Sequence, residues 1–181
     1  IKSADKFIHH INKDIWLASL PFYHVGGFSI ILRTLAAGCC LLIPSAIKWD
    51  KLISCLDLHK PSLMSFVPIM LKRIVGSSII PWENLRHIFV GGGPVPNKLI
   101  EDAIKLSWPI STVYGSTETS SMVTLSSSDN LKKNGMSAGK PLDGVDIKFD
   151  NNNNLRGKAE GNIIIESKSI SSGYHNLFSN E

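Results

Sequence analysis

The chain has 181 residues, of which 43% are hydrophobic and 19% are charged. This balance is typical of a packed globular protein and excludes a largely disordered chain. The formal charge is +4, but the basic residues are scattered, which argues against nucleic-acid binding. No apolar stretch is long enough to span a membrane.

Three cysteines, Cys39, Cys40 and Cys55, show no metal-ligand spacing. We expect them to be reduced core residues of a cytosolic, cytoplasmic protein. The chain starts at Ile1 and stops at Glu181 without a terminal element, so we expect it to be the central piece of a longer protein.

Short apolar runs alternate with amphipathic stretches along the first 120 residues, which is typical of an α/β layer fold. The predicted strands are residues 14–20, 39–43, 63–67, 87–90 and 110–114. The predicted helices are residues 25–37, 68–75 and 96–106, and one that Asp50 caps and that carries Leu52, Ile53, Leu56 and Leu58.

The helical signal stops after about residue 120, and residues 122–125, 145–149 and 162–166 indicate short strands. Residues 150–154 suit a hairpin tip, because Asn and Asp tolerate left-handed turns. The predicted fold class is α/β, with a doubly wound, mostly parallel sheet flanked by helices and then a small antiparallel β subdomain. The predicted domains are residues 1–120 and residues 121–181.

Three predicted parallel strands end in glycine-bearing segments, namely residues 21–27, 91–94 and 114–119. The carboxyl ends of parallel strands share one edge of a sheet, which is where ligands bind in such folds. The run Gly91, Gly92, Gly93 lets a ligand touch the backbone, although it also suits a flexible turn. Pro94 argues against flexibility because it fixes φ.

The segment from Tyr114 to Glu118 combines an aromatic ring, Gly115, two hydroxyls and a carboxylate. The ring can stack on a base, the Thr117 hydroxyl can hold a phosphate oxygen, and the Glu118 carboxylate can hold Mg²⁺. The alternative is a helix N-cap at Ser116 or Thr117, with Glu118 near the helix dipole.

Two further polar residues invite a functional interpretation. His24 lies at a strand's carboxyl edge, before Gly26 and Gly27, although a lone histidine is more often structural. Arg33 lies in an otherwise apolar helix, where a buried guanidinium needs an anion. Its stem could instead pack while its head reaches water. The first alternative predicts that Arg33 neutralises an anionic substrate.

At these residues the sequence resembles the adenylate-forming superfamily of acyl-CoA synthetases, luciferases and peptide-synthetase adenylation domains. The resemblance covers essentially the whole chain. The loop 91–94 and the block 114–118 are similar to two of its signature segments, and residues 159–165 with 173–174 resemble a third. Within it, residues 20–27, 91–96, 114–121 and 137–142 are most similar to the 2-succinylbenzoate–CoA ligases of menaquinone biosynthesis.

The resemblance implies a ligase that adenylates a carboxylate with ATP and Mg²⁺ and passes the acyl group to CoA. It implies that Gly91, Gly92, Gly93, Pro94 and Tyr114 to Thr117 bind the nucleotide, with Thr117 on phosphate, and that Glu118 binds the metal. His24, Thr117 and Glu118 would be catalytic. The acid would be bound by His24, Gly26, Gly27, Arg33, Gly92 and Ser120.

The resemblance also implies segments that this sequence does not contain, namely a phosphate-binding Ser/Thr/Gly-rich loop, a ribose-binding motif and a C-terminal domain with a catalytic lysine. Asn162 stands where a glutamate is usual in the third signature. We therefore expect the isolated chain to be inactive. The oligomeric state is left open, a homo-oligomer of the complete protein included.

Three rival interpretations remain at this point. The acid could be another aryl or fatty acid. The chain could be a non-catalytic nucleotide-binding or scaffolding domain. A dinucleotide-binding domain is disfavoured, because no Gly-x-Gly-x-x-Gly follows the first predicted strand.

Overall fold

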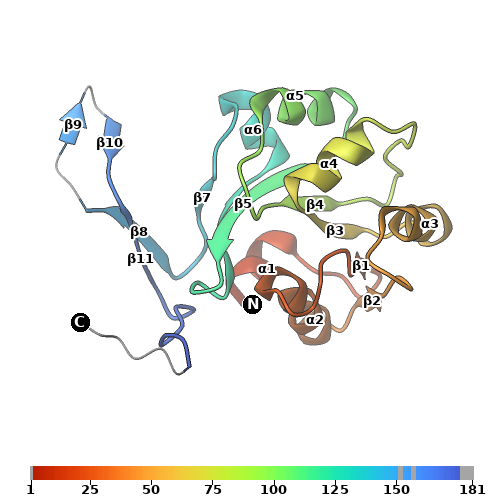
Figure 1. The fold of residues 1–181 in the computed structure, drawn as a ribbon, viewed down its shortest axis with the longest axis horizontal. Coiled ribbons are helices and arrows are strands. Elements are labelled where there is room, and N and C mark those ends of the chain that lie inside the picture. Colours follow the sequence, from red (N-terminus) through yellow and green to blue (C-terminus); the bar gives the residue numbers. More distant parts are fainter. Residues whose placement is uncertain (1, 151–152, 156–157, 176–181) are drawn as a thin grey trace.

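The computed structural model describes residues 2–150, 153–155 and 158–175. A seven-stranded sheet carries helices on both faces, and two small two-stranded ladders project from one side (Figure 1). The helices are α1 (Lys2–Ile8), α2 (Val25–Ala37), α3 (Trp49–His59), α4 (Pro68–Val75), α5 (Asn97–Lys105) and α6 (Ser128–Asn134). The strands of the large sheet are β1 (Ile15–Leu17), β2 (Cys40–Leu42), β3 (Leu63–Phe66), β4 (His87–Val90), β5 (Ile110–Ser116), β6 (Ser121–Ser126) and β7 (Lys140–Pro141).

The strand order of the large sheet is β2-β1-β3-β4-β5-β6-β7. The first five strands are parallel, and β6 and β7 are antiparallel to their neighbours. The chain moves from β1 outward to β2 and then crosses back to β3, so the winding direction reverses between β1 and β3. The predicted doubly wound, mostly parallel sheet is confirmed.

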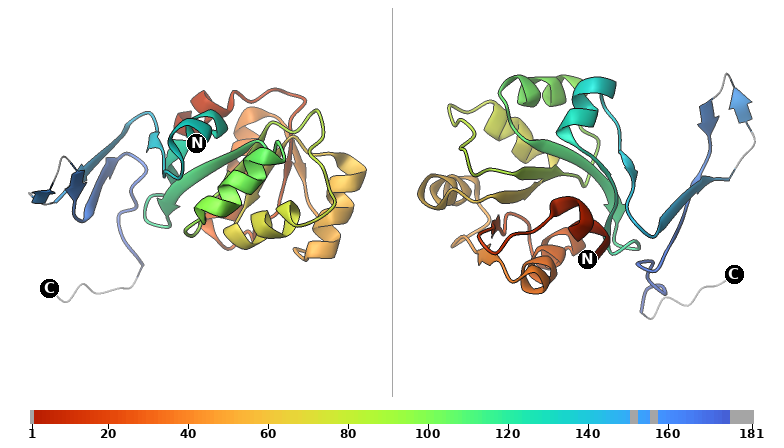
Figure 2. Two further views of the ribbon diagram at one scale, coloured as in Figure 1. Left: turned by 90° about the horizontal axis from the view of Figure 1, so that it is seen from above. Right: turned by 180° about the vertical axis from the view of Figure 1, so that it is seen from behind.

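Alternate residues of the central strands pack against helices on opposite faces of the sheet, as the two-residue period of a strand requires. Trp16 of β1 packs with Ile30 of α2 on one face, whereas Leu17 packs with Leu56 of α3 on the other. Helices α1 and α2 cover the first face, and α3, α4, α5 and α6 cover the second (Figure 2).

The prediction for α2 is confirmed at both ends. Gly38 ends it with a φ of 65°, a left-handed conformation that suits glycine, and its N–H bonds back to the last helical turn. Pro68 begins α4 as predicted, because a residue in the first helical turn needs no N–H donor. Pro96 precedes α5 as its N-cap.

Two details of α3 differ from the prediction. The helix begins at Trp49 with Lys48 as its N-cap, so Asp50 lies in the first turn and does not cap it. Leu58 is 76% exposed, whereas Leu52 and Leu56 are buried. The inward face of α3 therefore follows the four-residue spacing of the buried pair.

The prediction that helices end near residue 120 is wrong, because α6 follows β6. Its N-cap is Ser127, whose Oγ accepts a hydrogen bond from the Asn130 N–H at 3.3 Å. Leu131 is its one buried residue. A helix of 7 residues, which is about two turns, with one buried residue leaves too little periodicity to be read from the sequence.

Strands on both sides of residue 120 share the large sheet, so the division into two domains there stays a prediction. A separate ladder pairs β8 (Val145–Phe149) with β11 (Ile163–Ser167), and a second pairs β9 (Asn153–Leu155) with β10 (Lys158–Glu160). The predicted hairpin tip at 150–154 lies partly outside the described residues.

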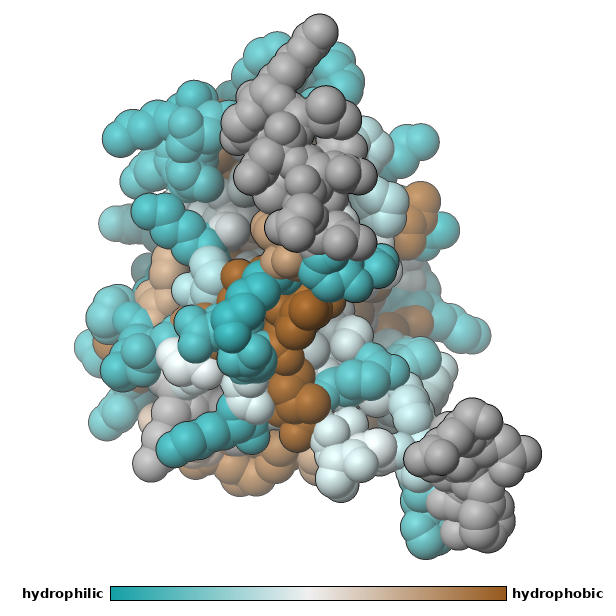
Figure 3. Space-filling view, turned by 90° about the vertical axis from the view of Figure 1, so that its left-hand side faces the viewer, coloured by the Kyte–Doolittle hydropathy of each residue, from teal (hydrophilic) through white to brown (hydrophobic). Residues whose placement is uncertain are grey.

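The β8–β11 ladder carries apolar residues outward from the core. Val145 is buried, Ile147 and Ile165 are partly buried against the core, and Phe149 and Ile163 are about half exposed. Figure 3 faces this side of the molecule and shows a strip of apolar surface running down from the grey atoms.

The three cysteines are free, but the prediction that they lie in the core is wrong for Cys40, which is exposed. It belongs to β2, which forms one edge of the sheet and so has a neighbour on one side alone. None of the helices in the described part of the chain has the length and apolar character needed to cross a membrane.

Candidate active site at the carboxyl edge of the sheet

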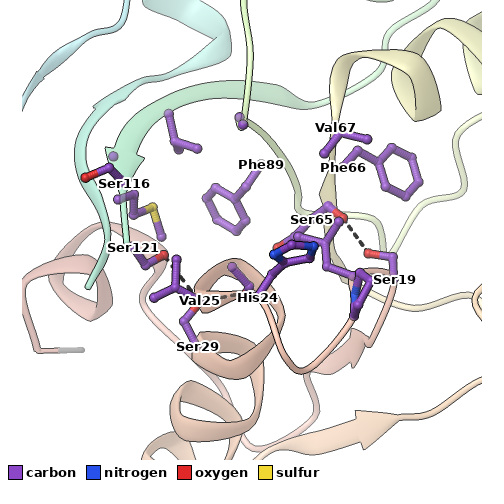
Figure 4. Close-up of a pocket in the computed structure, with 18 of the residues that line it drawn as sticks. Ser19, His24, Val25, Ser29, Ser65, Phe66, Val67, Phe89, Ser116 and Ser121 are labelled. Atoms are coloured by element: carbon purple, nitrogen blue, oxygen red, sulfur yellow. Dashed lines mark hydrogen bonds between the residues drawn. The ribbon is translucent and has the colours of Figure 1, made fainter. Parts of the chain in front are cut away.

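A pocket of about 540 Å³ opens at the carboxyl edge of the parallel strands, next to the start of α2 (Figure 4). It lies where the winding direction of the sheet reverses, the position at which such folds bind ligands. The predicted site residues that line it are His24, Gly26, Arg33, Gly91, Gly92, Gly115, Ser116 and Thr117. Three separate glycine-bearing segments therefore meet at one pocket.

Six predicted site residues lie outside the pocket lining, namely Gly27, Gly93, Pro94, Tyr114, Glu118 and Ser120. Five of them adjoin a lining residue in the chain, and Pro94 is two residues from Gly92, which lines the pocket. Tyr114 is 39% exposed. The pocket and its rim together hold all three predicted segments.

Glycine is required at several of these positions for packing. A Cβ on Gly27 would lie 2.1 Å from the Pro21 carbonyl oxygen, and one on Gly91 would lie 2.6 Å from Val113 Cγ2. Gly92 has a φ of +77°, which glycine adopts without strain. Gly91 is thus packed closely against β5, and Gly92 has a left-handed backbone. These two constraints argue against the interpretation of the loop as a flexible turn.

His24 is the N-cap residue of α2 and enters the pocket from the loop after β1. Its side chain makes no capping hydrogen bond, so the imidazole is not occupied by the helix end. Figure 4 shows the ring directed into the pocket that Ser65 and Phe89 also line. This placement leaves the ring nitrogens available to a ligand.

Arg33 is 5% exposed and lines the pocket, so the alternative in which its head reaches water is wrong. Its Nη2 donates to Ser121 Oγ at 3.4 Å, and Ser121 Oγ lies 3.3 Å from Ser29 Oγ. The guanidinium carbon lies 5.9 Å from the centre of the Trp16 ring, within the range of a cation–π interaction.

The charge of Arg33 is poorly compensated. No carboxylate in the described part of the chain forms an ion pair with it, and its Nε has no hydrogen-bond partner there. Burial lowers the pKa of Arg33 to about 10, and the charge of Asp5 opposes this only in part. The side chain is therefore still cationic at neutral pH, and a buried cation without a partner is suited to an anionic ligand.

The turn after β5 carries Thr117 and Glu118. Strand β5 continues to Ser116, and four turn residues lead directly into β6, so the alternative of a helix N-cap at Ser116 or Thr117 is wrong. Thr119 is buried and ties the turn together, accepting from the Ser116 N–H at 2.8 Å. Thr117 is exposed and lines the pocket.

Glu118 presents an exposed carboxylate at the pocket's rim. Hydrogen bonds from the Ser116 side chain and from the Tyr174 hydroxyl lower its pKa to about 2, so it is ionised at neutral pH. No cluster of three or more His, Cys, Asp or Glu side chains that could enclose a metal occurs in the described residues. One ionised carboxylate fits Mg²⁺, which takes its other ligands from phosphates and water.

Several lining residues were not predicted from the sequence, among them Ser19, Ser65, Phe89 and Ser121. Ser65 lies on β3, which carries no glycine or charged residue at its end and so gives no local signal. Its Oγ accepts from Trp16 Nε1 at 3.3 Å, which joins β1 to β3 beneath the pocket. The strand order, which places β3 in the centre, is the signal that would have found it.

Comparisons with known proteins show the family to which the chain belongs. The family model described as "AMP-binding enzyme" matches residues 2–175. This chain belongs to that family. The 2-succinylbenzoate–CoA ligase of Oceanobacillus iheyensis is 34% identical over 168 residues, which are 91% of this chain and 34% of that protein. Two of the relatives that the chain matches are named 2-succinylbenzoate–CoA ligase.

Two solved structures of family members show the same fold. The O-succinylbenzoate coenzyme A synthetase of Bacillus subtilis in complex with ATP and magnesium ion superposes with a TM-score of 0.87, at 26% identity over 97% of this chain and 37% of that one. The same enzyme with the acyl-adenylate intermediate OSB-AMP gives a TM-score of 0.88, over 98% of this chain. The chain spans about a third of the length of the relatives it matches.

Proposed function

We propose that the protein activates a carboxylic acid with ATP and transfers the acyl group to CoA, and that this acid carries a second, unreacted carboxylate. 2-Succinylbenzoate is the acid that best satisfies this description, which would assign the protein to menaquinone biosynthesis. The observation that carries the proposal is Arg33, a buried cation in the pocket without a carboxylate partner among the described residues.

The charge requirement separates this substrate from its rivals. 2-Succinylbenzoate has an aliphatic carboxylate that would be activated and an aromatic one that would remain an anion. Arg33 and the hydroxyls of Ser29 and Ser121 form a cationic, hydrogen-bonding end to the pocket, which suits that second carboxylate. A fatty acid would leave this buried cation without an anion, at a free-energy cost.

The nucleotide would lie along the rim formed by the Gly91–Gly93 loop and the end of β5. The absence of a Cβ at Gly92 and Gly115 would allow it to approach the backbone, and Tyr114 would stack on the base. The Thr117 hydroxyl would hold a phosphate oxygen. Glu118 would hold Mg²⁺, which when bound neutralises charge on the phosphates.

The proposed reaction has two steps. An oxygen of the carboxylate attacks the α-phosphorus of ATP, the bond to the β-phosphate oxygen breaks, and pyrophosphate leaves. The CoA sulfur then attacks the acyl carbon, its bond to the AMP oxygen breaks, and AMP and the thiol proton are released. His24 would stand beside the carboxylate being activated. The protein contributes positioning and charge neutralisation in both steps.

The test compares substrates in the protein as it is naturally produced. CoA-ester formation is measured with 2-succinylbenzoate and with a monocarboxylate of similar size. For the Arg33→Ala variant we expect KM for 2-succinylbenzoate to rise roughly 10- to 100-fold, because a hydrogen bond to a charged group is worth about 1.5–3 kcal/mol. KM for ATP should not change.

Arg73→Ala is the matched control, since Arg73 is an exposed arginine on α4 outside the pocket lining. It should behave as the natural protein does. An unchanged KM for the dicarboxylate in Arg33→Ala would remove the support for a second carboxylate. Absence of any ATP-dependent ester with either acid would count against the ligase itself.

A further inference from the structure

The segment that follows β11 returns to the active-site turn and contacts it at three points. We call residues 168–174 the strap. The Ser169 carbonyl accepts from Ser120 Oγ at 2.8 Å, and the Ser171 N–H donates to the Glu118 carbonyl at 2.7 Å. The Tyr174 hydroxyl donates to Oε1 of Glu118. The strap thus connects the β8–β11 ladder to the turn beside the end of β5 (Figure 1).

The turn that the strap contacts has an unusual backbone. Ser120 has a φ of 55° and Ser121 a φ of 95°, a region that residues with a Cβ rarely adopt. Such conformations persist only where the surroundings over-determine them, and they gather at functional sites. The strap supplies part of that constraint, because it forms hydrogen bonds with Glu118 and Ser120.

The strap holds the turn from outside the pocket. No strap residue lines the pocket, and Tyr174 is 55% exposed. Its hydroxyl makes a hydrogen bond to the carboxylate of Glu118 and to no other group in the described residues. The hydrogen bond of Tyr174 is therefore specific to the Glu118 side chain at the rim, and Tyr174 is not part of the hydrophobic core.

We propose that Tyr174 is a positioning residue, which holds the carboxylate of Glu118 in the orientation that receives a divalent cation bound to nucleotide phosphates. The proposal rests on the function proposed above. The hydrogen bonds from Tyr174 and from the Ser116 side chain still leave lone pairs of the carboxylate open to the cation, because a carboxylate has about four acceptor positions. It also restricts the rotation of an exposed side chain, so less order has to be gained when the metal and nucleotide bind.

The test substitutes Tyr174→Phe, which removes the hydroxyl and keeps the ring. The readout is the binding of a non-hydrolysable ATP analogue, measured by calorimetry as Mg²⁺ is varied, in the protein as it is naturally produced. We expect the Mg²⁺ concentration for half-maximal binding to rise roughly tenfold, as is usual when the partner of a metal ligand is lost. AMP binding without metal and KM for the acid should stay unchanged.

Glu166→Gln is the matched control, because it weakens an exposed hydrogen bond, Lys148 Nζ to Glu166 Oε1 at 2.7 Å, on β11 just before the strap. It should leave the Mg²⁺ dependence unchanged. Equal losses of AMP, acid and metal affinity in Tyr174→Phe would point to a general structural role and overturn the proposal. Tighter Mg²⁺ binding would show that Tyr174 competes with the cation and would overturn it too.

A Glu118→Ala variant separates this proposal from the one on which it rests. If Glu118→Ala abolishes the Mg²⁺ dependence and Tyr174→Phe leaves it unchanged, the positioning role fails while the metal site stands. If Glu118→Ala has no effect on the Mg²⁺ dependence, the metal assignment of Glu118 fails and the role of Tyr174 fails with it.

Discussion

Two arginines on opposite edges of the sheet are treated differently by the fold. At the amino edge, Arg86 pairs with Asp14, whose side chain is fully buried, and it also donates to the carbonyls of Ile8 and His9 at 2.8 and 3.0 Å. At the carboxyl edge, Arg33 is buried among hydroxyls and an indole ring, and its Nε has no partner within the described part of the chain.

The difference separates a structural charge from a functional one. The Asp14 carboxylate also accepts from Ser62 Oγ at 2.7 Å and from the Ile11 N–H at 3.0 Å, so this network satisfies itself and ties α1 and β1 to the start of β4. The charge of Arg33 is left for a molecule that the protein does not supply. A completed network stabilises the fold, whereas an incomplete one at a pocket favours binding.

The largest effect is expected from breaking the completed network. Asp14→Ala would leave Arg86 without its carboxylate and the Ile11 N–H without an acceptor, and should lower the free energy of unfolding by about 3 kcal/mol. Urea denaturation measures this change in the free energy of unfolding. Asp50→Ala, which removes an exposed carboxylate from the first turn of α3, should change it by less than about 0.5 kcal/mol. Equal effects of the two would contradict the structural role of Asp14.

A slightly smaller effect is expected from the backbone of the carboxyl edge. A Cβ on Gly115 would lie 2.0 Å from the Ser121 carbonyl oxygen, so Gly115→Ala should push β5 and β6 apart and cost about 2 kcal/mol. Gly26→Ala is the matched control in the same pocket, because its Cβ would meet only Leu20 Cδ1, at 3.3 Å. Thermal unfolding of both variants tests the close approach of β5 to β6 at Gly115.

Acid should destabilise the fold through a buried histidine at the amino edge. Burial lowers the pKa of His87 to about 4, so below pH 6.5 the unfolded chain binds a proton that the folded chain does not. Stability should therefore fall as the pH falls from about 6.5 to 4. The pKa of His10 is lowered too, by burial, in the same direction, whereas the contribution of Asp14, whose pKa is also lowered, is lost only below its ordinary value of 3.8.

The measurement is the Tm at pH 7.5 and at pH 5.5. We expect a decrease of a few degrees that becomes smaller in His87→Phe, since Phe preserves the stacking on Phe89, whose ring centre lies 5.5 Å away. A Tm that rises on acidification would contradict the sign derived for His87.

The smallest effect on stability is expected at Arg33. Measuring it is the most direct test of the difference between Arg33 and Arg86. Arg33→Met replaces a poorly compensated buried charge with an apolar chain of similar length, so the free energy of unfolding should change by less than about 1 kcal/mol. Arg86→Met would leave the buried carboxylate of Asp14 without its ion-pair partner, and should lower the free energy of unfolding by several times more. A loss at Arg33 as large as that at Arg86 would mean that Arg33, too, is mainly structural.

Much of the fold could be predicted because the signals are local. Helix α2 follows from an apolar run that ends at Gly38, and α4 from the proline at residue 68. Helix α6 could not be predicted, since it has one buried residue and its position depends on packing beside β5 and α5. The exposure of Cys40 was missed for a similar reason, because an apolar run does not reveal whether its strand is central or at an edge.

The same division applies to the site. His24, Gly92 and Thr117 were predicted because their residue types are unusual at strand ends, and all three line the pocket. Ser65 and Ser121 carry no such mark and were found only in the folded chain. The sequence alone left the orientation of Arg33 open, since the side chain is long enough to reach either water or the pocket.

The amino-acid sequence by itself determined the parallel α/β class, the three segments that end strands at one edge, and the resemblance to adenylate-forming enzymes. These follow from apolar periodicity and from residue types whose backbone or charge requirements act locally. The tertiary structure alone decided that β3 lies between β1 and β4, that Arg33 is buried without a carboxylate partner, and that Tyr174 returns to Glu118. Those facts depend on contacts between residues far apart in the chain, and only the packing of the sheet, helices and strap brings them together.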